Sequence, residues 1–230
     1  MMPVYVSGSW LLANRLAEPQ LFDVWVVEKP NRVLSRIVAL PGEELSIVAG
    51  ELRIDGGYRD WKNLRYAYRI WCTEEVQLAA DSYTPLYKNR IYTARLTPSK
   101  ADSTASIPGV RKLKKLTHNK AYFPSVFPHD PDYPWSRDYF GPLVVPGAGE
   151  ELTLTKYNYK LYIRLILDEG GQLHVDGHCL FINGQETDRY VVKKDYYWVM
   201  CDNRHAAVDS RNFGFVARDE LTGKAIVLFE

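Results

Sequence analysis

Short runs of apolar and β-branched residues dominate the first quarter of the chain. Val24–Glu28 and Arg36–Leu40 are two such runs, each of a length typical of a strand. Glu44–Val48 and Glu51–Ile54 follow, and they flank Ala49-Gly50, a pair that favours a tight turn. The pattern therefore predicts two strands and then a β-hairpin.

The C-terminal quarter shows the same pattern. Leu180–Asn183 and Gln185–Val192 flank Gly184 and predict a second hairpin. Asp195–Met200 is an apolar and aromatic run that predicts a buried strand, and Lys224–Phe229 predicts a closing strand. Strand signals thus lie at both ends of the chain.

The middle of the chain is less regular. Residues 58–125 mix polar, aromatic and basic positions with little alternation, and 128–149 carry five prolines and three glycines, which favours extended loop. Lys156–Leu167 predicts one helix with an apolar face that includes Tyr159, Ile163 and Ile166. The basic run Arg111–Leu116 is interpreted as a solvated loop or helix face, with contact to anionic lipid as the alternative.

These patterns together predict a mainly β fold. We expect a core of coiled antiparallel sheets formed by residues 1–56 and 172–230. Residues 57–171 are expected to form a long insertion lobe of mixed α and β or irregular structure.

Composition narrows the function classes. The chain has 230 residues and a formal net charge of +1, so there is no electrostatic case for nucleic-acid binding. Its 16 Tyr and 6 Trp fit pleated surfaces and support the β prediction. Cys72, Cys179 and Cys201 show no CxxC spacing, so neither a metal site nor a cofactor is expected. One disulfide remains possible, and the redox compartment stays open.

The chain contains no run of 18 apolar residues, so no transmembrane segment is expected in it. The N-terminal stretch MMPVYVSGSW also lacks the basic region and apolar core of a signal peptide. Two interpretations stay open, a chain that is soluble as it stands and a chain from which an anchor has been left out.

Three stretches carry candidate chemistry. Tyr5–Trp10 reads YVSGSW, Ser35–Glu43 reads SRIVALPGE, and Cys201–Gly214 reads CDNRHAAVDSRNFG. In this order they resemble the bacterial type I signal peptidases, whose motifs have the forms SGSM-x-PTL, KR-x-x-x-LPGD and GDNR-x-x-S-x-DSR-x-x-G. The stretches at Pro134–Pro146 and Ile182–Tyr190 are also similar to that family. The resemblance implies a β-sheet core of the signal-peptidase type and a serine endopeptidase that removes signal peptides.

The resemblance also implies roles for individual residues. Ser9 matches the nucleophile, and Ser7 matches a hydroxyl that stabilises the developing oxyanion. The family places its general-base lysine where this chain has Ser35, and the serine that orients this lysine where the chain has Ala207. A structural brace of aspartates and arginines beside the active site matches Asp202, Arg204, Asp209 and Arg211.

The two replacements remove the base. A lysine accepts the proton of the serine hydroxyl only as a neutral amine, and serine cannot act as a base at neutral pH. The serine motif has also drifted, because Trp10 and the LLAN stretch replace the methionine and the x-PTL pattern. The groups that remain as candidate bases by their presence alone are Lys29, Lys193, Lys194, Lys224 and His205.

Three hypotheses follow. The favoured one is a signal-peptidase-like protein of impaired proteolysis that binds signal peptides or other extended peptides along a strand edge. The alternatives are an active peptidase with a substituted base and a non-enzymatic assembly subunit that pairs with another signal peptidase or secretion component. The resemblance implies the extracytoplasmic, periplasmic face of the inner membrane, with contact to the membrane surface possible.

Overall fold

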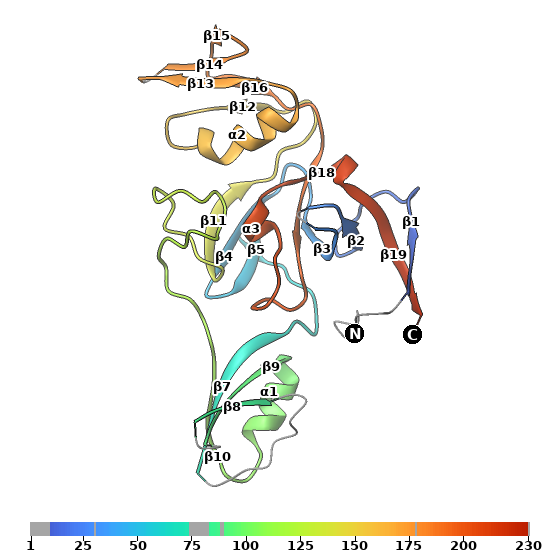
Figure 1. Ribbon diagram of the computed structural model, residues 1–230, viewed down its shortest axis with the longest axis vertical. Helices are drawn as coiled ribbons and strands as arrows, with labels where there is room; N and C mark the ends of the chain where they lie inside the picture. Colours follow the sequence, from blue (N-terminus) through green and yellow to red (C-terminus); the bar gives the residue numbers. More distant parts are fainter. Residues whose placement is uncertain (1–9, 30, 74–82, 88–89, 178, 230) are drawn as a thin grey trace.

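The computed structural model describes residues 10–29, 31–73, 83–87, 90–177 and 179–229 (Figure 1). The fold is mainly β, as the apolar pattern predicts, and every pairing between its named strands is antiparallel. No helix among the described residues is long and apolar enough to cross a membrane.

A six-stranded sheet brings the two ends of the chain together. In spatial order its strands are β1 (Trp10–Asn14), β19 (Leu221–Phe229), β2 (Val24–Val27), β3 (Val33–Ala39), β17 (Tyr196–Met200) and β18 (Val216–Ala217). The central strand β17 is entirely buried and almost entirely apolar or aromatic, whereas β3 buries Ser35 and Arg36 among its apolar residues.

A second sheet contains the predicted hairpin of β4 (Glu44–Val48) and β5 (Glu51–Ile54). Its other strands are β6 (Gly57–Tyr58) and β11 (Tyr139–Val144). Because β11 pairs with β4, the prediction of extended loop over 128–149 is wrong for the residues of this strand. The pairing places Phe140 and Leu143 in the core.

Residues 64–116 form a separate unit at one end of the molecule (Figure 1). Its sheet has the order β10 (Val110–Lys115), β7 (Tyr66–Cys72), β9 (Ile91–Leu96) and β8 (Tyr83–Tyr87), and α1 (Pro98–Ala105) packs on it. The basic run Arg111–Leu116 is therefore largely an edge strand, and the prediction of a loop or helix face is wrong. The unit has a hydrophobic core of its own.

Smaller elements lie at the opposite end. They are β12 (Glu151–Thr153), α2 (Tyr159–Asp168), β13 (Leu173–Asp176), β14 (Cys179–Ile182), β15 (Gln185–Glu186) and β16 (Arg189–Val191). Only the start of Gln185–Val192 pairs with β14, because β16 pairs with β12 instead. The predicted helix is present, but its buried face is Leu161, Tyr162, Leu165 and Ile166. The division into domains 1–56 plus 172–230 and 57–171 stays a prediction.

Aromatic rings fill the main core between these sheets. Trp198 in β17 is fully buried and contacts the rings of Phe127, Phe140 and Phe215 at centroid distances of 6.0, 5.2 and 5.8 Å. The short helix α3 (Ser210–Phe213) and the 3-10 turn η1 (Arg218–Glu220) follow β17. This core therefore fixes the position of the third sequence stretch, which runs from Cys201 to Gly214.

We predict that Gly214→Ala destabilises the protein by about 3 kcal/mol or more. Gly214 has φ +82°, and an added Cβ would lie 2.6 Å from the ring of Phe127, so backbone strain and overpacking add together. Gly184 has φ +80° but open space around it, and Gly184→Ala should cost only about 1 kcal/mol. Chemical denaturation of both variants measures the difference. Equal losses would contradict the packing argument.

Candidate active site

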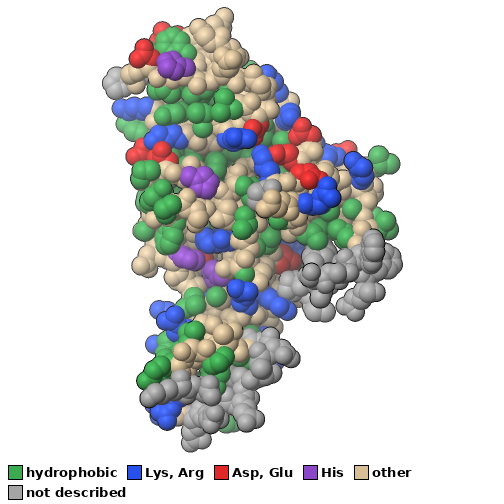
Figure 2. All heavy atoms as spheres, in the orientation of Figure 1, with side chains coloured by type: hydrophobic (Ala, Val, Ile, Leu, Met, Phe, Trp, Pro, Cys, Tyr) green, Lys and Arg blue, Asp and Glu red, His purple; other side chains and the backbone are tan. Residues whose placement is uncertain are grey.

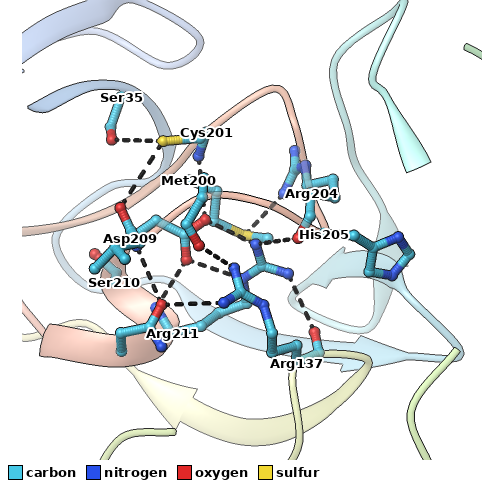
Figure 3. A network of polar contacts seen from close by, with 12 residues as sticks. Ser35, Arg137, Met200, Cys201, Arg204, His205, Asp209, Ser210 and Arg211 are labelled. Carbon is cyan, nitrogen blue, oxygen red and sulfur yellow. Dashed lines mark hydrogen bonds and ion pairs between the residues drawn. The ribbon is translucent and has the colours of Figure 1, made fainter. Parts of the chain in front are cut away.

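Ser35, which the motif resemblance aligns with the family's lysine, lies inside the central sheet. It is 1% exposed in β3, and its hydroxyl is 3.3 Å from the Sγ atom of Cys201 (Figure 3). Cys201 directly follows β17, the strand that pairs with β3. Its Sγ atom also lies 3.4 Å from the carbonyl oxygen of Leu34. The thiol therefore packs against Ser35.

Cys201 is a poor nucleophile in this position. Burial raises the pKa of its thiol to about 11, and the charge of Asp209 acts in the same direction. Because the thiolate is the reactive form, the protonated thiol is inert at neutral pH. The backbone of Cys201 lies outside the left-handed region, so a side chain at this position introduces no backbone strain.

Arg36 joins the second sequence stretch to the third. Its Nε atom donates to Oδ1 of Asp202 at 2.8 Å, and its Nη2 atom donates to Oδ2 at 2.6 Å. Nη1 donates to the carbonyl oxygen of Phe22, and the guanidinium lies 4.5 Å from the ring centroid of Trp61. This bidentate pair fixes the loop after β17 against β3.

Asp209 and Arg211 form a second bidentate pair in the interior (Figure 3). Their side chains are 0% and 1% exposed, and Nη2 of Arg211 lies 2.7 Å from Oδ2 of Asp209. Burial acts to raise the pKa of Asp209, but the charge and hydrogen bonds of Arg211 outweigh it and lower the pKa. The carboxylate is therefore held in its charged form.

The same two side chains fix the surrounding backbone. Asp209 caps the N-terminus of α3 by accepting from the backbone N–H of Arg211. Arg211 donates to the carbonyl oxygens of Arg204 at 2.7 Å and Arg137 at 3.3 Å. Asp209 also accepts from the backbone N–H of Cys201 at 3.3 Å. The pair thus connects both ends of the third stretch.

Arg204 pairs with Asp60, a residue that the sequence motifs do not include. Their side chains are 3% and 1% exposed. Burial raises the pKa of Asp60, against the opposing charge of Arg204. Asp60 lies outside all three stretches, and no local pattern in a single sequence marks it as a partner of Arg204.

Ser210 satisfies a backbone group that the sheet leaves unpaired. The register between β17 and β3 shifts between Trp198 and Val199. The N–H of Val199 donates to the Oγ atom of Ser210 at 3.0 Å. A buried N–H needs such a partner, so this serine serves the fold.

Ala207, which the motif resemblance aligns with the family's orienting serine, lies in the same neighbourhood. Its carbonyl oxygen accepts from Nη2 of Arg137, and the carbonyl oxygen of Val208 is 4.0 Å from Sγ of Cys201. The structure thus brings Ser35, Cys201 and the segment 207–209 together. Ser7 and Ser9 lie outside the described residues.

The lysines considered as replacement bases contact other groups. Their partners are Asp168 and Glu220 for Lys29, the carbonyl oxygen of Glu169 for Lys193, Asp219 for Lys194 and Asp23 for Lys224. Three of these four lysines therefore form ion pairs with carboxylates. The hydrogen bond to Asp219 raises the pKa of Lys194.

Both ring nitrogens of His205 are occupied. Nδ1 accepts from the backbone N–H of Ala67 at 2.8 Å, and Nε2 lies 3.0 Å from Oδ1 of Asp138. His118 contacts the same carboxylate with its ring Nδ1 and its backbone N–H, both at 2.7 Å. Neither nitrogen of His205 is available to take a proton from a serine.

His118, Asp138 and His205 place possible metal-ligating atoms within 4.8 Å of one another. A histidine ligand offers the lone pair of one nitrogen while the other nitrogen carries the proton. In His205 the N–H of Ala67 occupies the lone pair of Nδ1, so the proton is on Nε2, the nitrogen that faces Asp138. The arrangement fits a hydrogen-bond network better than a metal centre.

Comparison with known proteins finds a match in the C-terminal part of the chain. The family model for signal peptidase, peptidase S26, matches residues 153–229, which include the whole third stretch. Signal peptidase I of Aquifex aeolicus is 36% identical over 77 residues, covering 34% of this chain and 27% of that protein. The C-terminal third of the chain thus matches the type I signal peptidases. A second relative, the probable signal peptidase I-2 of Synechocystis, is 29% identical over 102 residues. The match covers 39% of this chain and 47% of that protein.

The chain thus spans less than half the length of the curated signal peptidases it matches. The matched family segment contains Cys201, Ala207 and the Asp209–Arg211 pair, whereas Ser9 and Ser35 precede it. The match to the family therefore rests on the C-terminal third.

We predict that Asp209→Ala lowers the free energy of unfolding by about 3–5 kcal/mol, because it leaves Arg211 buried and unpaired. Chemical denaturation provides the measurement. Asp219→Ala is the matched control, because Asp219 is 61% exposed in its pair with Lys194, and the loss there should stay below about 1 kcal/mol. An Asp209→Ala variant as stable as this control would show that the interior pair contributes nothing.

We predict that the ionised form of Asp138 contributes to stability and that this contribution is lost in acid. Burial acts to raise the pKa of Asp138, but the hydrogen bonds from His205 and His118 outweigh it and hold the pKa well below its ordinary value. This stabilisation is complete above the unfolded pKa of about 4 and is lost as the pH falls toward the folded value.

Asp138→Asn should therefore make the decrease in stability below about pH 4 shallower, as measured by denaturation across this range. Asp176→Asn, which changes an exposed acid in β13, is the control. An unchanged acid slope in Asp138→Asn would contradict the assigned role.

Proposed function

We propose that this chain is a signal-peptidase-like protein whose proteolysis is lost or strongly impaired and which retains a site for extended peptides. The contact between Ser35 and Cys201 carries the proposal. At the position of the family's lysine, a hydroxyl meets a thiol whose pKa is raised to about 11. Neither group accepts a proton from a serine hydroxyl at neutral pH.

The replacements at this position complement one another. A short side chain at Ser35 stands where the family has a long one, and Cys201 carries a thiol where the family has glycine. Interiors are closely packed, and the two side chains contact each other at 3.3 Å. With Ala207 in place of the orienting serine, three neighbouring changes support a site adapted to the absence of the amine.

The loss of the base sets the scale of the impairment. General-base assistance commonly contributes about 10²–10⁴-fold to the rate of such a reaction. Ser7 and Ser9 are retained in the sequence, so an oxyanion site could still hold a peptide carbonyl without cleaving the bond.

Peptide binding has a structural basis in β1. This strand directly follows Ser9 in the sequence and is one of the two edge strands of the six-stranded sheet among the described strands, the other being β18. An extended peptide can pair with such an edge through main-chain hydrogen bonds. We propose signal peptides or similar extended segments as ligands, at the extracytoplasmic face of the inner membrane.

We predict that the protein binds a signal-peptide substrate without cleaving it above background, and that Ser9→Ala leaves this background unchanged. Fluorescence anisotropy measures binding, and mass spectrometry of the same samples detects products. Turnover that disappears in Ser9→Ala would favour an active peptidase with a substituted base. Absence of binding, together with a stable complex with another secretion component, would favour an assembly subunit.

Restoring the missing groups tests the same proposal from the other direction. Ser35→Lys alone would place its side chain against Cys201, so we predict that activity requires Cys201→Gly and Ala207→Ser as well. The triple variant should gain weak cleavage that Ser9→Ala abolishes, and the gain should exceed the product of the single effects.

The variant Ser35→Met, Cys201→Gly, Ala207→Ser is the matched control, because it has a long side chain without an amine. A folded triple variant that is as inactive as this control would show that the loss extends beyond the base to the serine motif.

A further inference from the structure

Positive charge is concentrated in the unit of residues 64–116. This segment contains ten lysines and arginines against four aspartates and glutamates, a formal charge of +6, whereas the whole chain carries +1. We call it the basic unit. Figure 2 shows lysine and arginine side chains where this unit meets the rest of the molecule. Such an uneven distribution of charge favours an anionic partner.

A cavity of about 750 Å³ lies between the basic unit and the third sequence stretch. Arg65, Thr93, Arg95 and Lys100 line it from the basic unit, and Asn203 and His205 line it from the other side. Its volume is in the range of sites for small organic ligands. No aspartate or glutamate is among the described residues that line it.

The three cations of the cavity have no acidic partner among the residues that the structure describes. Within the described part of the chain, the side chains of Arg65, Arg95 and Lys100 form no ion pair. The arginines of the brace, by contrast, are each matched with a carboxylate. Three unmatched cations around one cavity create a positive potential inside it.

The N-terminus of α1 adds to this potential. Thr97 and Lys100, at the start of the helix, line the cavity. Thr97 caps the helix through the N–H of Lys100, and the first turn contains no acidic residue that would balance the helix dipole. The contribution of the helix is its dipole rather than free N–H groups, because Pro98 has no N–H and the N–H of Lys100 is used by the cap.

We propose that this cavity binds a phosphate monoester or a similar dianionic phosphate group. Three cations exceed the single charge of a carboxylate but suit the double charge of a phosphate monoester. The planar fork of an arginine also matches two phosphate oxygens at once. The site does not depend on the proposed loss of proteolysis, because none of its side chains belongs to the Ser35–Cys201 contact.

The cavity also connects to the brace. Asn203 and His205 lie within the third stretch, on either side of Arg204, whose side chain pairs with Asp60. The backbone N–H of Arg204 donates to the carbonyl oxygen of Arg65, and the N–H of Arg65 donates to the carbonyl oxygen of Asp202. A phosphate bound to Arg65 would therefore contact a residue that is hydrogen-bonded directly to the signal-peptidase motif.

Titration with inorganic phosphate tests the site, with isothermal calorimetry as the measurement. We expect saturable binding that weakens at least about tenfold in the double variant Arg95→Gln, Lys100→Gln, the scale for losing charge-assisted hydrogen bonds. Both side chains are exposed, so circular dichroism and the melting temperature without phosphate should match the wild type. Arg111→Gln removes an exposed cation of β10 outside the cavity and should change the affinity less than about twofold.

Absence of saturable binding, or equal weakening in Arg111→Gln and the double variant, would overturn the proposal. The second result would show that general charge, rather than the cavity, attracts the anion. Sulfate titrated in parallel reports whether any dianion suffices, and equal affinities for sulfate and phosphate would overturn the assignment to phosphate.

Vesicles distinguish a lipid headgroup from a soluble phosphate ester. Phosphatidylcholine vesicles with and without phosphatidic acid are sedimented with the wild type and the double variant. A headgroup in the cavity is supported if only vesicles with phosphatidic acid capture the wild type, if they do not capture the double variant, and if inorganic phosphate releases the bound protein. No capture, with binding of inorganic phosphate intact, supports a soluble ester. If the vesicles still capture the double variant, if added phosphate does not release the protein, and if phosphate binding does not depend on the cavity, the proposed site is overturned.

Discussion

The interior ion pair between Asp209 and Arg211 is the constraint on which the candidate site depends. Removing two charges from water is unfavourable unless their geometry and remaining hydrogen bonds are nearly complete. Here the carboxylate accepts both arms of the guanidinium and two backbone N–H groups, while the guanidinium also donates to two carbonyl oxygens. Because each partner satisfies the other, the loop after β17 has few alternative conformations.

This dependence explains how the brace can persist under the proposed loss of the base. Asp202 holds Arg36 in the central sheet, and Arg204 holds Asp60 near the start of the basic unit. These pairs join separate parts of the fold, so their loss would affect stability whether or not a peptide bond is cleaved. The proposed replacement of a lysine base by Ser35 removes no such pair, because Ser35 lies within the buried strand β3.

Sequence predicted the features that depend on neighbouring residues. The hairpin of β4 and β5 follows from its turn at Ala49-Gly50 and matches the structure. The apolar pattern does not predict the strand β7, although its buried positions alternate. Three of its four buried residues are tyrosines or cysteine, and Arg69 and Trp71 lie between them, so the alternation of apolar and polar residues is weak. The contact of Ser35 with Cys201 spans 166 positions, and the pairing of Arg204 with Asp60 spans 144. Such contacts arise from tertiary packing, which no local pattern encodes.

The separate core of residues 64–116 has a consequence for how the molecule opens. Its first and last strands, β7 and β10, are neighbours in one sheet, so the chain enters and leaves this unit at nearly the same place. A unit with its own core and adjacent ends can unfold locally while the remaining sheets stay folded. Hydrogen exchange would then report two cooperative units. His205, which accepts from the N–H of Ala67 in β7, is one of the hydrogen-bonded contacts between them.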